Sequence, residues 1–177
     1  MRLFIPVAEG FEDIEVFSVI DVMRRAGIPI DTVGVSGSVV TSCSGVRVMV
    51  DRKMMEIKAE DYDGVIIPGG SKAVDILKRT NSLLEIIKKL DNKQKLVAAI
   101  CAAPTILAKL GILEERKATV YPGLERELPK PRDDKVIVDK NIITSQGPGT
   151  AIEFSLKIVE FLKGEAKAEQ IRRDLIA

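Results

Sequence analysis

A cysteine at a strand-to-helix junction is the residue in this chain best suited to chemistry. An apolar run over residues 96–100 ends at Cys101, and a helical pattern starts at Pro104. A sharp turn from strand to helix lifts its pivot residue above the sheet, where hydrolases place a nucleophile. A helix N-terminus also favours a thiolate. The alternative is that Cys101 is a small buried core residue, as free cysteines often are.

The sequence contains no histidine, so covalent chemistry on this thiol must use a carboxylate or let the helix dipole hold the thiolate. Glu15, in the first turn of a predicted helix, is the candidate carboxylate. Its neighbours are apolar, and burial there would raise its pKa, so that in its protonated form it could hydrogen-bond the thiolate and pass protons to and from a substrate. The alternative is an ordinary acidic residue favoured at a helix start, a description that fits Glu9, Glu12 and Asp13.

The glycine pair Gly69-Gly70 follows another apolar run. Without side chains, its backbone N–H groups can approach a substrate oxygen, and with the amide of Ala102 they would form an oxyanion hole. A tight turn alone would also explain the pair. The Gly147–Gly149 segment is either a helix-start loop or part of the pocket rim.

These residues lie on a chain in which short apolar runs alternate with helical patterns. The runs predict strands at residues 3–7, 30–35, 64–67, 96–100, 118–120, 136–138 and 142–144, and a hairpin from 39–43 and 46–50. The helical patterns cover residues 12–26, 71–77, 82–90, 104–110, 150–162 and 166–175. Apolar strands that alternate with helices predict a single-domain α/β sandwich, with a mostly parallel sheet and helices on both faces.

Ligands bind outside the carboxyl ends of the strands in such sheets. Three predicted strands lead at that edge to Glu15, to Gly69-Gly70 and to Cys101. A carboxylate, a glycine turn and a thiol should therefore meet there, which favours a functional Cys101 over a buried structural one.

Size and composition limit the other possibilities. The 177 residues suggest one domain, and 27 basic against 26 acidic residues give a net charge of +1. We find no basic stripe, polybasic patch, signal peptide or membrane span, so we expect a cytoplasmic protein without a specific nucleic-acid or membrane partner. Two cysteines make no disulfide framework, and Cys43, in a strand-like stretch, is interpreted as a structural thiol. No residues show metal-ligand spacing in the sequence, and we expect neither a metal nor a cofactor.

Several segments together resemble the ThiJ/PfpI superfamily, in the branch of the parkinsonism-associated protein deglycase and its bacterial chaperone-like relatives. The segments that carry the resemblance are residues 21–27, 67–70, 98–104, 144–150 and 164–175. The resemblance implies a flavodoxin-like sandwich, with residues 1–177 forming a single domain and 165–177 a C-terminal surface helix. It also implies a homodimer packed partly through the first helix, where Arg24 and Arg25 are available for contacts.

The resemblance also assigns roles. It implies that Cys101 is the oxidisable nucleophile, Glu15 its protonated partner, and Gly70 and Ala102 backbone donors, with Gly69 and Tyr121 beside the substrate. The chain departs from the family pattern twice. Ala102 stands where the peptidase-like branch has histidine, which weakens a proteolytic interpretation. Tyr121 stands where several members have a pocket histidine, and because tyrosine is the weaker base, glyoxalase-type turnover is expected to be slow or absent.

The first functional hypothesis is a cofactor-free, cysteine-dependent deglycase or glyoxalase-type hydrolase. It would act on methylglyoxal, on glyoxal and on their early adducts with proteins or nucleotides. The second is a redox-sensing stress protein or chaperone in which Cys101 is oxidised to a sulfinate. A weaker third is an intracellular cysteine peptidase. Production of lactate from methylglyoxal separates the first from the second.

Overall fold

A computed structural model describes all 177 residues, Met1–Ala177, and contains a seven-stranded sheet in the order β5-β2-β1-β6-β7-β9-β8. Its strands are β1 Leu3–Val7, β2 Ile30–Gly34, β5 Arg52–Lys53, β6 Gly64–Ile67, β7 Leu96–Ile100, β8 Val136–Asp139 and β9 Ile142–Ser145. Only the edge strand β8 is antiparallel to its neighbour. The inner order β2-β1-β6-β7-β9 is that of flavodoxin-like sheets. A separate hairpin joins β3 Val39–Thr41 to β4 Arg47–Met49.

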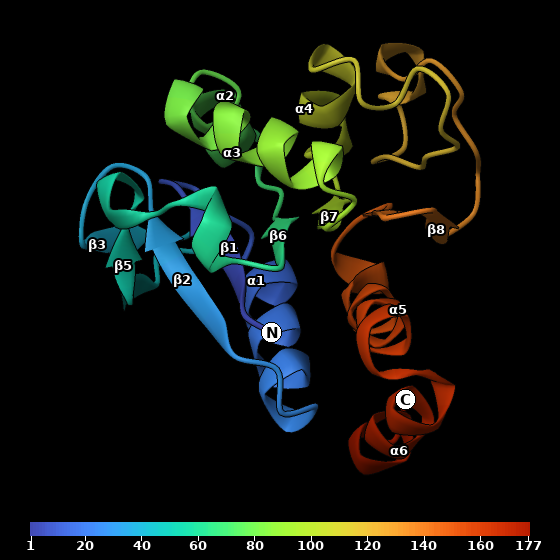
Figure 1. Cartoon of the computed structure of the whole chain (residues 1–177). Helices are drawn as coiled ribbons and strands as arrows, with labels where there is room; N and C mark the ends of the chain where they lie inside the picture. The colour runs from blue at the N-terminus through green and yellow to red at the C-terminus, as the bar shows by residue number, and fades with distance from the viewer.

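Helices cover both faces of the sheet. They are α1 Asp13–Arg25, α2 Ser71–Leu77, α3 Asn81–Asn92, α4 Pro104–Lys109, α5 Ala151–Lys163 and α6 Glu165–Leu175. Helices α1 and α5 pack together on one face, with α6 against α5, and α3 lies across the sheet on β6 and β7 (Figure 1). The predicted α/β sandwich is confirmed. None of the helices is long and apolar enough to cross a membrane.

The core lies on the central strands, because a sheet covered on both faces buries every strand residue. All residues of β1, β6 and β7 are buried. Packing on both faces of the sheet therefore fixes the ends of these strands. The loops that follow them at the carboxyl edge are positioned by this core.

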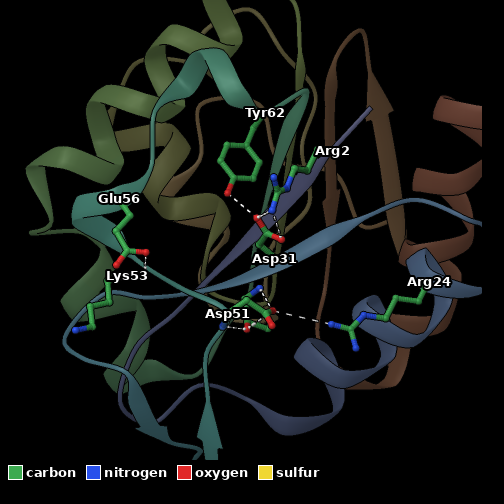
Figure 2. Close-up of polar contacts among 8 residues, drawn as sticks. Arg2, Arg24, Asp31, Asp51, Lys53, Glu56 and Tyr62 are labelled. Atoms are coloured by element: carbon green, nitrogen blue, oxygen red, sulfur yellow. Dashed lines mark hydrogen bonds and ion pairs between the residues drawn. The ribbon is translucent and has the colours of Figure 1, made fainter.

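Polar contacts fix the outer strand β2 to its surroundings (Figure 2). The Asp31 carboxylate accepts a hydrogen bond from Tyr62 Oη at 2.6 Å and pairs with Arg2 at 2.8 Å. The Asp51 carboxylate accepts from the backbone N–H of Thr32 at 2.9 Å. These bonds pair the buried polar atoms at this side of the sheet, as burial requires.

The structure corrects two sequence-based expectations. The predicted strand at residues 118–120 is wrong: Ala118 and Val120 are buried, but Ala118 forms only an isolated bridge with Pro131. The predicted strand at residues 39–43 ends at Thr41, so Cys43 lies beyond β3 and is exposed.

Candidate active site

Cys101 occupies a strained elbow between β7 and α4. Its φ is 64°, a left-handed conformation that residues with a side chain rarely adopt. The strain is held from both sides, because the Cys101 N–H donates to the Ser145 carbonyl at 3.0 Å and its carbonyl accepts from the Tyr121 N–H at 2.8 Å. Such strain persists only where the surroundings over-determine it. The elbow is therefore built to present the partly exposed Cys101 side chain above the sheet.

Glu15 points into the same region from the first turn of α1. Its side chain is fully buried. Oε2 accepts a hydrogen bond from the Gly69 N–H at 2.6 Å, whereas Oε1 is buried and makes no hydrogen bond. The carboxyl group lies beside the Cys101 thiol, since a Cβ built on Gly69 would meet both groups. One oxygen is thus fixed and the other is free to exchange a proton.

Gly69 brings these two groups together because it has no side chain. A Cβ built on Gly69 would lie 2.5 Å from Cys101 Cβ, 2.7 Å from Glu15 Oε2 and 3.0 Å from Cys101 Sγ. Gly70 is equally constrained, with φ 94° and a hypothetical Cβ only 2.2 Å from the Gly10 carbonyl oxygen. The two glycines are therefore required by close approach, and a tight turn alone does not account for them.

Burial is the largest influence on the pKa values of both Glu15 and Cys101. Burial raises the pKa of Glu15 to about 7, and the Gly69 N–H opposes this by stabilising the carboxylate. Burial, together with the charge of an ionised Glu15, raises the pKa of Cys101 to about 12. Two negative charges in one buried space are strongly disfavoured, so near neutral pH the pair carries no more than one.

Burial of the sulfur disfavours the alternative in which the helix dipole alone holds a thiolate. Helix α4 begins at Pro104, three residues beyond Cys101, and the sulfur is too desolvated for the dipole to ionise it. Near neutral pH the proton therefore rests on the sulfur and the negative charge on Glu15, and a thiolate exists only in the minor form in which the proton has moved to Glu15. Two backbone groups then favour the anion, because hydrogen bonds from the N–H groups of Ala102 and Gly70 lower the pKa of the thiol.

Tyr121 lies at the rim of the site. Its side chain is 48% exposed, and its ring would lie 3.3 Å from a Cβ on Gly147. The Gly147 turn thus packs against this ring. The fold therefore brings all the proposed site residues to one edge of the sheet: Cys101, Glu15, Gly69, Gly70, Ala102 and Tyr121. Their roles remain predictions.

The sequence did not reveal two further features. The backbone clamps on Cys101 come from Ser145 and Tyr121, and residue types carry no signal for such main-chain bonds. The fold also brings ligand atoms of Glu12, Asp13 and Cys43 within 4.8 Å of one another. All three side chains already make hydrogen bonds within the protein, and we assign no metal to them.

A parallel flavodoxin-like sheet with a cysteine at a strained strand-to-helix elbow defines a class of α/β proteins with a nucleophile-type thiol. The comparisons with known proteins narrow that class. The model of the DJ-1/PfpI family matches residues 1–161. The chain is 36% identical to protein dj-1beta of Drosophila melanogaster over 96% of this chain and 94% of that protein. It therefore belongs to the DJ-1/PfpI family.

Two more similarities support this membership. The chain is 36% identical to the Parkinson disease protein 7 homolog of Danio rerio, over 99% of this chain and 96% of the relative. The solved structure of oxidized Toxoplasma gondii DJ-1 superposes with a TM-score of 0.96 at 35% identity, covering 99% of this chain and 97% of that one. The family expected from the sequence motifs is thus confirmed, as is the flavodoxin-like fold.

Proposed function

We propose that the chain is a cofactor-free, cysteine-dependent enzyme of the deglycase or glyoxalase type. Its substrates are methylglyoxal, glyoxal and their early adducts with proteins or nucleotides, and we expect it to act in the cytoplasm. The observation that carries the proposal is the buried Glu15 carboxyl beside the Cys101 thiol. A pKa of about 7 suits a group that must both take and return a proton near neutral pH.

The first step joins Cys101 to the substrate. As the Cys101 sulfur bonds to the aldehyde carbon, the thiol proton passes to Glu15 and the carbonyl electrons move onto oxygen. That oxygen accepts hydrogen bonds from the N–H groups of Gly70 and Ala102, the two groups that also favour a charged sulfur. Glu15 then protonates the oxygen to give a hemithioacetal.

The second step is an internal redox exchange. A proton leaves the carbon bonded to sulfur and returns to the neighbouring carbonyl carbon through an enediol. The first carbon is thereby oxidised to a thioester and the second is reduced to an alcohol, so no external oxidant is needed. Water then cleaves the thioester, which releases lactate from methylglyoxal and restores the thiol of Cys101.

The test is lactate production from methylglyoxal by the wild type, Cys101→Ala and Cys43→Ser. We expect turnover in the wild type and in Cys43→Ser, and none in Cys101→Ala. Wild-type protein that makes no lactate, or a Cys101→Ala variant that retains turnover, would overturn the proposal. Turnover is expected to be slow, since Tyr121 supplies no second base at the rim.

A second candidate function is a redox-responsive stress protein or chaperone. The partial exposure of Cys101 favours it, because access governs oxidation of thiols. The relative from Toxoplasma gondii was solved as an oxidized protein. In this reading a protonated Glu15 donates to a Cys101 sulfinate. A peptidase is not proposed, because Ala102 replaces the histidine that its chemistry would use.

We further propose that the protein forms a homodimer through α1 and the β3–β4 hairpin. Ile14 and Phe17 on α1 are 55% and 40% exposed, and Met49 on the hairpin is 79% exposed. These apolar side chains, rather than Arg24 and Arg25, support the interface. Both arginines are already paired within the chain, Arg24 with Asp51 and Arg25 with Asp21. A second copy would cover the apolar surface.

A further inference from the structure

The residue that caps α1 is an unusual choice. Glu12 Oε2 accepts a hydrogen bond from the Glu15 N–H at 2.8 Å, and the Glu12 N–H donates to the Gly69 carbonyl at 3.3 Å. Glu12 is thus bonded both to Glu15 and to the glycine that holds Glu15. Helices prefer serine, threonine, aspartate or asparagine at this position. Capping alone does not require glutamate, so its negative charge needs another explanation.

The charge of Glu12 acts on Glu15. Like charges one helical turn apart repel, so the Glu12 carboxylate disfavours ionisation of Glu15 and works in the same direction as burial. The other groups facing Glu15 are the Gly69 N–H, from the β6–α2 turn, and the Cys101 thiol, from the β7–α4 elbow. No cationic side chain faces the carboxyl group.

We propose that Glu12 is a positioning residue for the Cys101–Glu15 pair: its bonds fix Glu15 against Gly69, and its charge shifts the shared proton away from sulfur and toward Glu15. The inference deepens the proposed function and rests on it for its biological meaning. The proton itself can be followed without turnover, through the reactivity of the Cys101 sulfur. The placement of a charge beside the acid thus determines how much thiolate the pair supplies.

The test is the rate of Cys101 alkylation by iodoacetamide from pH 5 to 9, with the site assigned by mass spectrometry. In Glu12→Gln the side chain still accepts from the Glu15 N–H, but the charge is gone. We expect the midpoint of the profile to fall by about half a pH unit and the plateau to drop about threefold, since half a unit corresponds to that factor. The low-pH part of the rate profile, which we call the acid limb, should not move, because at low pH Glu15 is protonated with or without the charge of Glu12.

An unchanged acid limb distinguishes loss of charge from structural damage, which would displace the whole curve. Glu12→Asp keeps the charge and should restore the wild-type profile. Asp13→Asn is the matched control, since the Asp13 carboxylate accepts a hydrogen bond from Ser44 Oγ at 2.8 Å and makes none with Glu15. If Glu12→Gln fails to fold, Glu12→Ser supplies a preferred cap without the charge and must show the same shift.

Two results would overturn the inference: a folded Glu12→Gln protein with the wild-type profile, or an equal shift in Asp13→Asn. A lactate assay on the same samples separates this inference from the proposed function. If the profile shifts as expected but the wild type makes no lactate, Glu12 keeps its positioning role and the enzyme proposal fails. If lactate is made but the profile does not shift, the enzyme proposal stands and the positioning role of Glu12 fails.

Discussion

The backbone N–H of Gly69 holds the Glu15 carboxyl at 2.6 Å, and the absent side chain of Gly69 leaves the space in which Cys101 stands. Gly69 therefore supplies both the hydrogen bond that holds Glu15 and the space that Cys101 occupies. It lies at the end of β6, whereas Glu15 comes from α1 and Cys101 from the end of β7. The parallel sheet brings the three together, because the carboxyl ends of β1, β6 and β7 share one edge.

Substituting Gly69 by alanine should damage the site more than the fold. A Cβ would lie 2.5 Å from Cys101 Cβ, so the elbow or the β6–α2 turn must shift. Overpacking of this kind costs about 1–3 kcal/mol of unfolding free energy. We expect a lower melting temperature and the loss of fast Cys101 alkylation. Gly149→Ala, where no atom lies within 4 Å of a Cβ, is the control and should match the wild type. Wild-type alkylation in Gly69→Ala would contradict this account.

The sequence was sufficient to predict the sheet and the convergence of the site. Strands β1, β6 and β7 are apolar at every position or nearly so, and a pattern of that kind signals burial on both faces. Burial in a parallel sheet then dictates where the strand ends meet. The glycine pair could be located for the same reason, since it directly follows β6.

The sequence was not sufficient where tertiary contacts decide. The two-residue strand β5 is exposed and polar, and it pairs with β2 next to Asp51, whose side chain accepts a hydrogen bond from the Thr32 hydroxyl. The protonation state of Cys101 could not be predicted from the sequence either, because it depends on how deeply the sulfur and Glu15 are buried together. The exposure of Cys43 follows from the short β3 strand, whose end no residue pattern marked.

The buried Glu15 carboxyl should make stability depend on pH. Its pKa is raised to about 7 in the folded state, against about 4.3 in an unfolded chain. Below pH 4 it is protonated in both states. Between about pH 4 and pH 7 the unfolded chain ionises this carboxyl group while the folded chain keeps it protonated, so stability falls by roughly 4 kcal/mol across that window and levels off above pH 7. Glu15→Gln should remove this fall and be the more stable protein at pH 8, though not at pH 4. Denaturant unfolding at both pH values checks this, and a pH-independent difference would refute it.

The two cysteines should differ in reactivity for a reason other than exposure. Cys43 is the more exposed, but burial and its hydrogen bond to Asp13 raise the pKa of its thiol. Cys101 has Glu15 as an internal proton acceptor. At pH 7.5 we expect iodoacetamide to modify Cys101 faster than Cys43, through the form in which the Cys101 proton has moved to Glu15. In Glu15→Leu that advantage should disappear, whereas a rate that survives the substitution would show that Glu15 is only a helix-start carboxylate.

The proposed dimer should depend on the apolar surface of α1. Sedimentation of the wild type at micromolar concentration should give about twice the 19.4 kDa mass of the chain. A glutamate in place of Phe17 puts a charge on the exposed apolar surface and should yield monomers. Arg25→Ala is the control and should remain a dimer, since Arg25 pairs with Asp21 of its own chain. A wild type that sediments as a monomer would remove the proposal.

Controlled oxidation should separate the enzyme from the redox sensor. Mild peroxide is expected to reach Cys101 first, because its proton can pass to Glu15 and access to the sulfur is partial rather than closed. The product should stop at the sulfinate. Cys43 is held by Asp13 at the tip of the hairpin, and nothing places it as a resolving thiol.

Intact mass, site assignment and activity are then compared on the same oxidised samples. An enzyme loses its nucleophile on oxidation, so lactate production should fall in proportion to the sulfinate fraction. A sensor has little lactate production to lose, and its oxidation should instead change thermal stability or the binding of an unfolded client. The Glu15→Leu variant sharpens the comparison, because it removes the donor that a sulfinate on Cys101 would need. Oxidation that falls first on Cys43, or a disulfide between the two cysteines, would contradict both functions, because each requires Cys101 to be the thiol that reacts.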